Sequence, residues 1–204
     1  KPHTSQSIWV KFPIVGPNKL NLKNAYAIIW TTTPWTLPAN RAIAVSPTLT
    51  YVLLEVEGEQ FLVAQGLAEK FADDCGIKNI KFGSTFLGSE LEGLITQHPF
   101  IQRQSPIVLA DYVNLESDTG CVHTAPGHGN EDYLTGLKYN LEIDCPVNDS
   151  GVLVARNGIP SELDGLSVGI HNGRCPANDG IIRLLQTNGN LLHSKDYVHS
   201  YPHC

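Results

Sequence analysis

Residues 51–64 have the sequence YVLLEVEGEQFLVA, in which Glu57-Gly58-Glu59 separates two short apolar runs. Short runs of valine, leucine and aromatic residues are typical of strands, and a glycine between two such runs is typical of a tight hairpin turn. We therefore predict a β-hairpin here. It is the clearest local signal in the chain, and it indicates a fold built from paired strands.

Similar short apolar or alternating runs lie on both sides of this hairpin. Most are rich in valine, isoleucine and aromatic residues and are bounded by glycine, proline, asparagine or aspartate, which predicts strands. Because closure leaves a sheet without unpaired edges, many short strands favour a mainly β fold with peripheral α-helices around a closed or nearly closed β-barrel core. The predicted strands are residues 8–14, 25–30, 42–45, 51–56, 60–64, 106–110, 121–123 and 152–154.

Three segments have helical rather than strand periodicity, because their apolar residues recur every three or four positions. Each has a residue suited to begin or end a helix, such as a polar N-cap or a terminal glycine. The segments are 66–76, with Leu67, Phe71 and Cys75 and an end at Gly76; 130–141, with Asn130 as N-cap and Leu134, Leu137 and Leu141 on one face; and 178–189, with Asn178 or Asp179 as cap, a buried stripe of Ile181, Leu184 and Leu185, and an end at Gly189.

Composition limits the possible functions. The 204 residues are 42% hydrophobic and 17% charged, and the net charge of −6 is opposite to that of a domain that binds a nucleic-acid backbone over a wide area. Any contact with a polyanion must therefore be local. Without a run of about 18 apolar residues or a signal peptide, we expect no membrane contact and a cytoplasmic location.

The chain has features of an excised single domain. It contains no methionine and begins at Lys1, and we find neither a repeat nor a linker, so we expect one domain over residues 1–204 that comes from a longer protein. Its five cysteines are widely spaced and form no CxxC pair, which indicates free thiols in a reducing compartment.

The first unusual segment is WTTTPWTLPAN, residues 30–40, which follows a predicted strand. Thr31, Thr32 and Thr33 offer hydroxyl groups on alternating faces, and Pro34 then turns the chain. Such a strand end can hydrogen-bond a ligand or orient a water molecule. Threonine is also simply a good strand residue, so this tripeptide by itself does not establish a site.

The second unusual segment is GCVHTAPGHGNEDY, residues 120–133, where a predicted strand ending at His123 leads through a proline–glycine turn into a predicted helix. A turn of this kind presents backbone N–H groups and side chains of both elements to one pocket. A lone His123 or Asp132 would more often be structural. Their concentration with further histidine, glycine and carboxylate residues favours a site, while we assign His128 to the turn and Tyr133 to core packing.

Together, WTTTPWTLPAN and HTAPGHGNEDY resemble the editing domain, also called CP1, of bacterial-type isoleucyl-tRNA synthetases, which are class I aminoacyl-tRNA synthetases. The resemblance continues through PIVLADYV, CPVNDSGV and the terminal HSYPHC. Related valyl and leucyl enzymes carry arginine at the position of Thr33, so the first motif points to the isoleucyl branch. This resemblance implies post-transfer editing, in which valine wrongly esterified to the isoleucine tRNA is hydrolysed while isoleucine is excluded by pocket size.

The resemblance also implies roles for individual residues. Asp132 would pair with the α-ammonium group of the amino acid, and His123 would line the amino-acid pocket and help to exclude isoleucine. Thr31, Thr32 and Thr33 would hold the ester and the terminal ribose and position a hydrolytic water. The remaining candidates for substrate binding are Trp30, Trp35 and Asn40, of which Asn40 would support the site and Trp35 would pack.

No nucleophile with an adjacent base is recognisable, so direct attack by water is favoured over a covalent intermediate. The HIGH and KMSKS motifs of the synthetic site are absent from the sequence. We therefore expect no cofactor for this domain, since ATP, magnesium and any zinc would belong to the parent enzyme. The expected partners are the 3′ end of valyl-tRNA(Ile) and the remainder of the synthetase, and we expect a monomer.

Two alternatives remain open. The first is a non-catalytic module that only binds the aminoacylated CCA end. The second is a metal site formed by His193, His199, His203 and Cys204, although their spacing is loose and strand-like alternation would separate the side chains. We accordingly predict no metal site, except that Cys204 would be half of a cysteine pair if its partner lay beyond the sequence.

Overall fold

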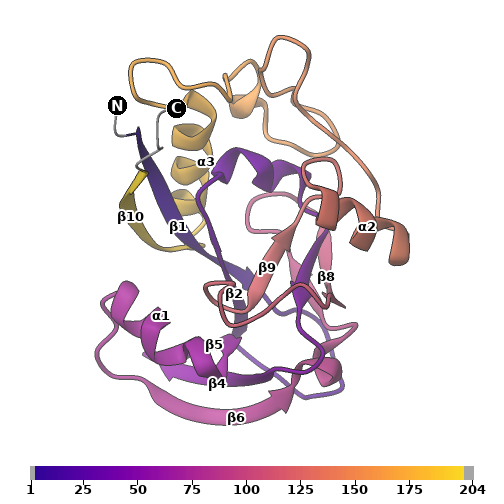
Figure 1. Cartoon of the computed structure of the whole chain (residues 1–204), viewed down its shortest axis with the longest axis vertical. Helices are drawn as coiled ribbons and strands as arrows, with labels where there is room; N and C mark the ends of the chain where they lie inside the picture. The colour runs from indigo at the N-terminus through magenta and orange to yellow at the C-terminus, as the bar shows by residue number, and fades with distance from the viewer. Residues whose placement is uncertain (1–2, 200–204) are drawn as a thin grey trace, which may run out of the picture.

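The computed structural model describes residues 3–199, and these residues contain ten strands and seven helical segments (Figure 1). The strands are β1 His3–Pro13, β2 Ala25–Thr31, β3 Ala42–Val45, β4 Thr50–Val56, β5 Glu59–Ala64, β6 Lys81–Leu87, β7 Ile95–Gln97, β8 Gln104–Leu109, β9 Cys121–Thr124 and β10 Leu191–His199. The α-helices are α1 Ala68–Asp74, α2 Asn130–Lys138 and α3 Pro176–Thr187, and the 3₁₀ helices are η1 Pro34–Ala39, η2 Gln65–Leu67, η3 Gly88–Leu91 and η4 Ser161–Leu163.

The described strands form two sheets. Six strands pair in the order β10-β1-β2-β5-β4-β6, and four pair in the order β7-β8-β3-β9. Neighbours are antiparallel except for β2 with β5 and β3 with β8. The mainly β class with few helices is thus confirmed, whereas these pairings show no closed barrel, and closure stays a prediction.

The predicted hairpin is present as β4 and β5, with Val56 opposite Glu59. Glu57 and Gly58 have φ angles of 50° and 84°. Positive φ at both central residues is the requirement of a type I′ turn, whose twist matches that of the strands it joins. The turn is therefore Glu57-Gly58, and Glu59 already belongs to β5.

The main core lies where side chains of both sheets meet α3. Phe12, Ile43, Leu62 and Leu185 are all at most 1% exposed there, and burial of each such side chain contributes about 1.5–3 kcal/mol. A second cluster packs on the other face of the six-stranded sheet, beneath α1. Because β2 contributes to both clusters, its sequence is apolar without alternation.

The predicted strands differ from the structure at four places. Residues 152–154 form only isolated bridges, whereas β6, β7 and β10 were not expected. Strand β6 is mostly exposed and polar, so it has no apolar pattern to detect. Its pairing with β4 is irregular near Leu53, where a Cβ on Gly83 would lie 2.8 Å from the Leu53 carbonyl oxygen.

All three predicted helices exist, with corrections at their ends and faces. The N-cap of α2 is Gly129 rather than Asn130, and α3 begins at Pro176, before the predicted caps. Proline suits that first position because its missing N–H would have no partner there.

Helix α2 does not bury its leucine face, since Leu134 and Leu137 are each 56% exposed. The expected core position of Tyr133 is also wrong, because this side chain is 42% exposed. The helix packs instead through Thr135 and Gly136, where a Cβ on Gly136 would lie 2.9 Å from Pro126. Periodicity alone did not distinguish the covered face from the open one.

Candidate functional site

The end of β2 presents the three threonines. Thr31 is buried, and its Oγ1 accepts a hydrogen bond from the Thr33 backbone N–H at 3.0 Å. This bond turns the chain at the strand end, and Pro34 then begins η1. Thr31 and Thr33 therefore differ in role. The Thr31 hydroxyl is used to form the turn, whereas the Thr33 residue is exposed.

The strand–turn–helix prediction for residues 120–133 is confirmed. Strand β9 pairs with β3, a turn follows, and α2 carries Asp132 in its first turn. The Asp132 Oδ2 accepts a hydrogen bond from the Ala125 backbone N–H at 2.9 Å. The carboxylate therefore joins the end of the strand to the beginning of the helix.

A pocket of about 310 Å³ lies between the end of β2 and the start of α2. It brings together six of the predicted site residues, from segments about 90 residues apart in the sequence. Trp35 and Asn40 lie outside its lining. The lining residues are Trp30, Thr31, Thr32, Thr33, Thr36, Val122, His123, Ala125, His128, Gly129 and Asp132.

Both ring nitrogens of His123 have protein partners. The Asn40 amide nitrogen lies 3.0 Å from the Ala42 carbonyl and 2.7 Å from His123 Nδ1, and because that carbonyl only accepts, the amide donates to both. Nδ1 is therefore an acceptor, and Nε2 carries the hydrogen that it donates to Thr36 Oγ1 at 2.9 Å. Burial, with a smaller effect of His128, lowers the pKa of His123 to about 3, so the ring is neutral.

Asp132 is the carboxylate of the pocket, and none of the ion pairs formed by residues 3–199 involves it. Burial raises its pKa, while the hydrogen bond from the Ala125 N–H opposes this rise. A partly buried carboxylate without a protein cation favours a ligand that brings a positive charge. The pocket can therefore bind an ammonium group beside hydroxyl groups.

Sequence reasoning missed five of the lining residues, and two of these, Thr36 and His128, have polar side chains. Thr36 follows the threonine run by three positions, and its hydroxyl donates to the Thr33 carbonyl at 2.9 Å while it accepts from His123. His128 packs edge-on against Trp35, with ring centroids 5.2 Å apart. The only signal in the sequence was that Thr36 lies within the first motif and His128 within the second.

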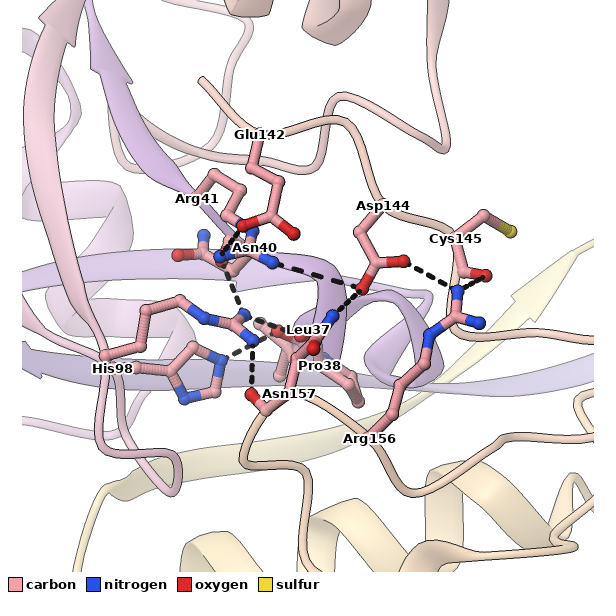
Figure 2. Close-up of polar contacts among 11 residues, drawn as sticks. Leu37, Pro38, Asn40, Arg41, His98, Glu142, Asp144, Cys145, Arg156 and Asn157 are labelled. Carbon is pink, nitrogen blue, oxygen red and sulfur yellow. Dashed lines mark hydrogen bonds and ion pairs between the residues drawn. The ribbon is translucent and has the colours of Figure 1, made fainter. Parts of the chain in front are cut away.

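Two side chains, of buried His98 and half-buried Arg103, hold backbone carbonyls of η1 and of its C-cap in place (Figure 2). His98 donates from Nε2 to the Leu37 carbonyl at 2.8 Å. Arg103 donates to the carbonyls of Pro38 and Asn40 at 2.8 and 3.1 Å. Since η1 carries Thr36, these bonds keep one wall of the pocket in position.

An ion-pair network continues outward from η1 (Figure 2). Arg41 lies 3.1 Å from Glu142 and 3.9 Å from Asp144, and Asp144 lies 2.6 Å from Arg156. Burial opposes ionisation of Asp144, but the hydrogen bonds from Arg156 and Asn157 and the two arginine charges lower its pKa overall. Through Arg41, which directly precedes β3, the network joins this strand to the segment 142–157. That segment lies beside the turn between β9 and α2, where Gly127 approaches Asp144.

The expectation of no metal site remains a prediction. Within residues 3–199, no three His, Cys, Asp or Glu side chains are arranged to hold a metal ion. His193 packs against Trp9 with ring centroids 5.5 Å apart, while His203 and Cys204 lie outside the described residues.

The four described cysteines are free thiols, as expected; they are Cys75, Cys121, Cys145 and Cys175. Among the described helices, none has both the length and the apolarity that a membrane span requires.

Comparison with known proteins gives consistent similarities along the chain. It is 49% identical over 202 residues to an isoleucine–tRNA ligase of Petrotoga mobilis and 47% identical over 207 residues to one of Nitratidesulfovibrio vulgaris. These alignments cover 99% of this chain but only about a fifth of each relative.

The fold has a solved counterpart. A crystal structure described as that of GlLeuRS-CP1 matches with a TM-score of 0.69 at 16% identity and covers 96% of this chain and 100% of that one. The family model described as "Leucyl-tRNA synthetase, editing domain" matches residues 19–155. From this match, the chain belongs to the family of aminoacyl-tRNA synthetase editing domains, and the relatives that it resembles along its whole length are isoleucine–tRNA ligases.

Proposed function

We propose that the chain hydrolyses the ester bond of valyl-tRNA(Ile) by means of a positioned water and excludes isoleucine by size. The observation that carries this proposal is the pocket lined by Thr31–Thr33 and by the carboxylate of Asp132, which has no ion-pair partner within residues 3–199. An amino acid ester offers an ammonium group, a carbonyl and a ribose, which match a carboxylate and neighbouring hydroxyl groups. Membership of the editing-domain family supports the same reaction class.

A separate hydrolytic site has a clear physical reason. One methylene in a hydrophobic pocket is worth only about 1–3 kcal/mol, a range for which valine rejection by isoleucyl synthetases is the standard example. A second pocket that admits valine and refuses isoleucine adds the missing discrimination. At about 310 Å³, the pocket lies at the small end of ligand sites, and the fully bonded ring of His123 forms a wall that resists displacement.

Each predicted residue has a role in this proposal. Asp132 binds the α-ammonium group, and His123 limits the space for the side chain. Thr31, Thr32 and Thr33 line the ester and the terminal ribose, with Trp30 beside them. Asn40 and Trp35 act indirectly, because Asn40 orients His123 and Trp35 packs against His128.

The hydrolysis proceeds by direct attack of water on the ester carbonyl carbon. The Thr36 hydroxyl is not hydrogen-bonded to a base that would make it a nucleophile, since it donates to the Thr33 carbonyl and accepts from His123 Nε2–H. Backbone N–H groups beside the pocket stabilise the negative charge on the carbonyl oxygen. The domain needs no cofactor of its own, and ATP, magnesium and zinc belong to the parent enzyme.

The proposed partners are the 3′ end of valyl-tRNA(Ile) and the rest of a cytoplasmic synthetase, of which this chain is one excised, monomeric domain. The net charge of −6 agrees with a contact confined to the CCA end. The other phosphate contacts would then belong to the remaining four-fifths of the parent enzyme.

Release of free amino acid from valyl-tRNA(Ile) and isoleucyl-tRNA(Ile) by the 204-residue chain tests the proposal. We expect kcat/KM for the valyl ester to exceed that for the isoleucyl ester by at least about tenfold, because one extra methylene must be accommodated. Equal rates for the two esters would contradict exclusion by size. Binding of the valyl ester without hydrolysis would indicate the non-catalytic CCA-binding module instead.

Variants locate the reaction in the pocket. Asp132→Ala should lower kcat/KM by about 30-fold or more, because a buried charge pair is lost. A combined alanine substitution of Thr31, Thr32 and Thr33 should abolish hydrolysis. Asp149→Ala and Thr85→Ala are matched controls at exposed positions, and a similar loss in these controls would show that the effect does not come from the pocket.

A further inference from the structure

The pocket contains three titratable side chains, His123, His128 and Asp132. Hydrolysis by water needs a group that accepts a proton from the water and later donates it to the leaving oxygen. His123 does not fit this role, because Asn40 donates to its Nδ1 and its Nε2–H is donated to Thr36. His123 is therefore a wall of the pocket without a free lone pair.

Asp132 does not fit the role of general base either. Its Oδ2 accepts the Ala125 N–H, and the proposed function uses its negative charge for the α-ammonium group. A carboxylate that took up the water proton would lose the charge that holds the substrate. The remaining titratable group of the lining is His128.

His128 lies in the turn between β9 and α2, where its backbone N–H donates to the Ala125 carbonyl at 2.9 Å. Its ring packs edge-on against Trp35, with ring planes 89° apart. The Nε2 atom is completely covered and has no hydrogen-bond partner among the described residues. Nδ1 is not among the covered atoms without a partner, so we infer that it is the nitrogen that a molecule in the pocket can reach.

We propose that His128 is a catalytic residue that acts as general base and then general acid in the hydrolysis, an inference that rests on the proposed function. The water oxygen attacks the ester carbonyl carbon while its proton moves to His128 Nδ1. The tetrahedral intermediate then collapses, the bond between the carbonyl carbon and the ribose oxygen breaks, and His128 returns the proton to that oxygen. The products are free valine and tRNA with both terminal hydroxyls, so atoms and charges balance.

The surroundings of His128 suit this cycle. Burial lowers its pKa and the charge of Asp144 raises it, with a net decrease. His123 from β9 and Asp132 from α2 are the other titratable groups of the same pocket. The ring is therefore neutral near pH 7, and in the tautomer with its hydrogen on Nε2 the Nδ1 lone pair is available to the water.

Steady-state hydrolysis of valyl-tRNA(Ile) by three variants tests the proposal. His128→Gln should lower kcat by about 10²–10⁴-fold, the usual contribution of a general base, with KM changed by no more than roughly threefold, since the ammonium and ribose contacts remain. His128→Ala should be equally slow and should regain at least about tenfold of its rate when imidazole is added. His171→Gln, at an exposed histidine outside the pocket, should keep the wild-type rate.

The outcomes separate the two proposals. If the wild-type chain hydrolyses the valyl ester but His128→Gln retains kcat within about fivefold, the assignment of His128 is overturned and the editing function stands. If His128→Ala melts at the wild-type temperature and imidazole does not restore its rate, the assignment is likewise overturned. If the wild-type chain itself does not hydrolyse the ester, the result contradicts the proposed function, and with it the role of His128. Should His128→Gln not fold, the imidazole response of His128→Ala decides.

Discussion

At the scale of single residues, Asn40 determines which nitrogen of His123 carries the hydrogen. Its amide group is fixed by three partners, because it donates to the Ala42 carbonyl and to His123 while its oxygen accepts from the Ser105 hydroxyl. Thr36 accepts the remaining His123 hydrogen. A ring with both nitrogens bonded is held in one orientation, which suits a wall that must reject a ligand larger by one methylene.

The protonation of His123 can be tested directly by nitrogen NMR of the imidazole. In the wild-type chain we expect the neutral form with hydrogen on Nε2 down to about pH 4, because burial lowers the pKa to about 3. Asn40→Asp places an acceptor beside Nδ1 and should raise the pKa of His123, since the charged ring is then favoured. A hydrogen on Nδ1 of His123 in the wild type would contradict the assignment.

Part of the site could be predicted at this scale. The threonines, His123 and Asp132 belong to two local motifs, so their composition was visible before the structure. The partners of His123 lie 83 and 87 residues away, and no local pattern encodes such contacts. The sequence predicts only a turn position for His128. It does not show that both ring nitrogens of His123 have hydrogen-bond partners while a ring nitrogen of His128 has none among the described residues.

At the scale of elements, η1 depends on three side chains, two from the loop between β7 and β8 and one from α3. His98 and Arg103 hold its carbonyls, and Asn178 of α3 accepts the Trp35 N–H at 2.9 Å. A 3₁₀ helix with internal Pro38 has few hydrogen bonds of its own. Its conformation therefore depends on these contacts, and with it the position of Thr36.

Removal of the Arg103 guanidinium should loosen η1. Arg103→Leu leaves the carbonyls of Pro38 and Asn40 without this donor, so the free energy of unfolding should fall by about 1–3 kcal/mol. Hydrolysis of the valyl ester should slow as well, because Thr36 and His123 lose their support. Urea unfolding with an activity assay measures both, and Arg183→Leu on the exposed face of α3 is the control; equal stability of the two variants would contradict this role.

The elements themselves were partly predictable. The hairpin and the three helices were found because turn chemistry and apolar spacing are local properties. Strand β6 was missed because it is an exposed strand whose pairing with β4, rather than its own apolar residues, makes it regular. The leucines of α2 misled the prediction, because spacing shows that residues share a face but not that another element covers it.

At the scale of the whole molecule, the pocket lies where the two sheets approach each other. Strand β2 of the six-stranded sheet contacts β9 of the four-stranded sheet, and each brings one motif. Burial keeps two histidines neutral, His123 in this pocket and His98 beside η1. Folding therefore depends on pH through these two rings.

Acid should destabilise the fold through both histidines. Burial lowers the pKa of His98 and of His123 to about 3, so between pH 6.5 and 3 the unfolded chain binds more protons than the folded one. Each ring then removes up to about 1.4 kcal/mol of stability per pH unit as the pH falls. Urea unfolding at several pH values should show this slope, and His98→Gln should reduce it; an unchanged slope in that variant would exclude His98 as a cause.

The pairing of β1 with β10 has one more consequence. His3 lies opposite His199 in the antiparallel register, so the two ends of the described chain run side by side (Figure 1). A module with neighbouring ends can be grafted into a surface loop of an unrelated host without stretching that loop apart. The paired ends of β1 and β10 would then form a two-stranded connection to the host, and the rest of the domain would move about this connection as a rigid unit.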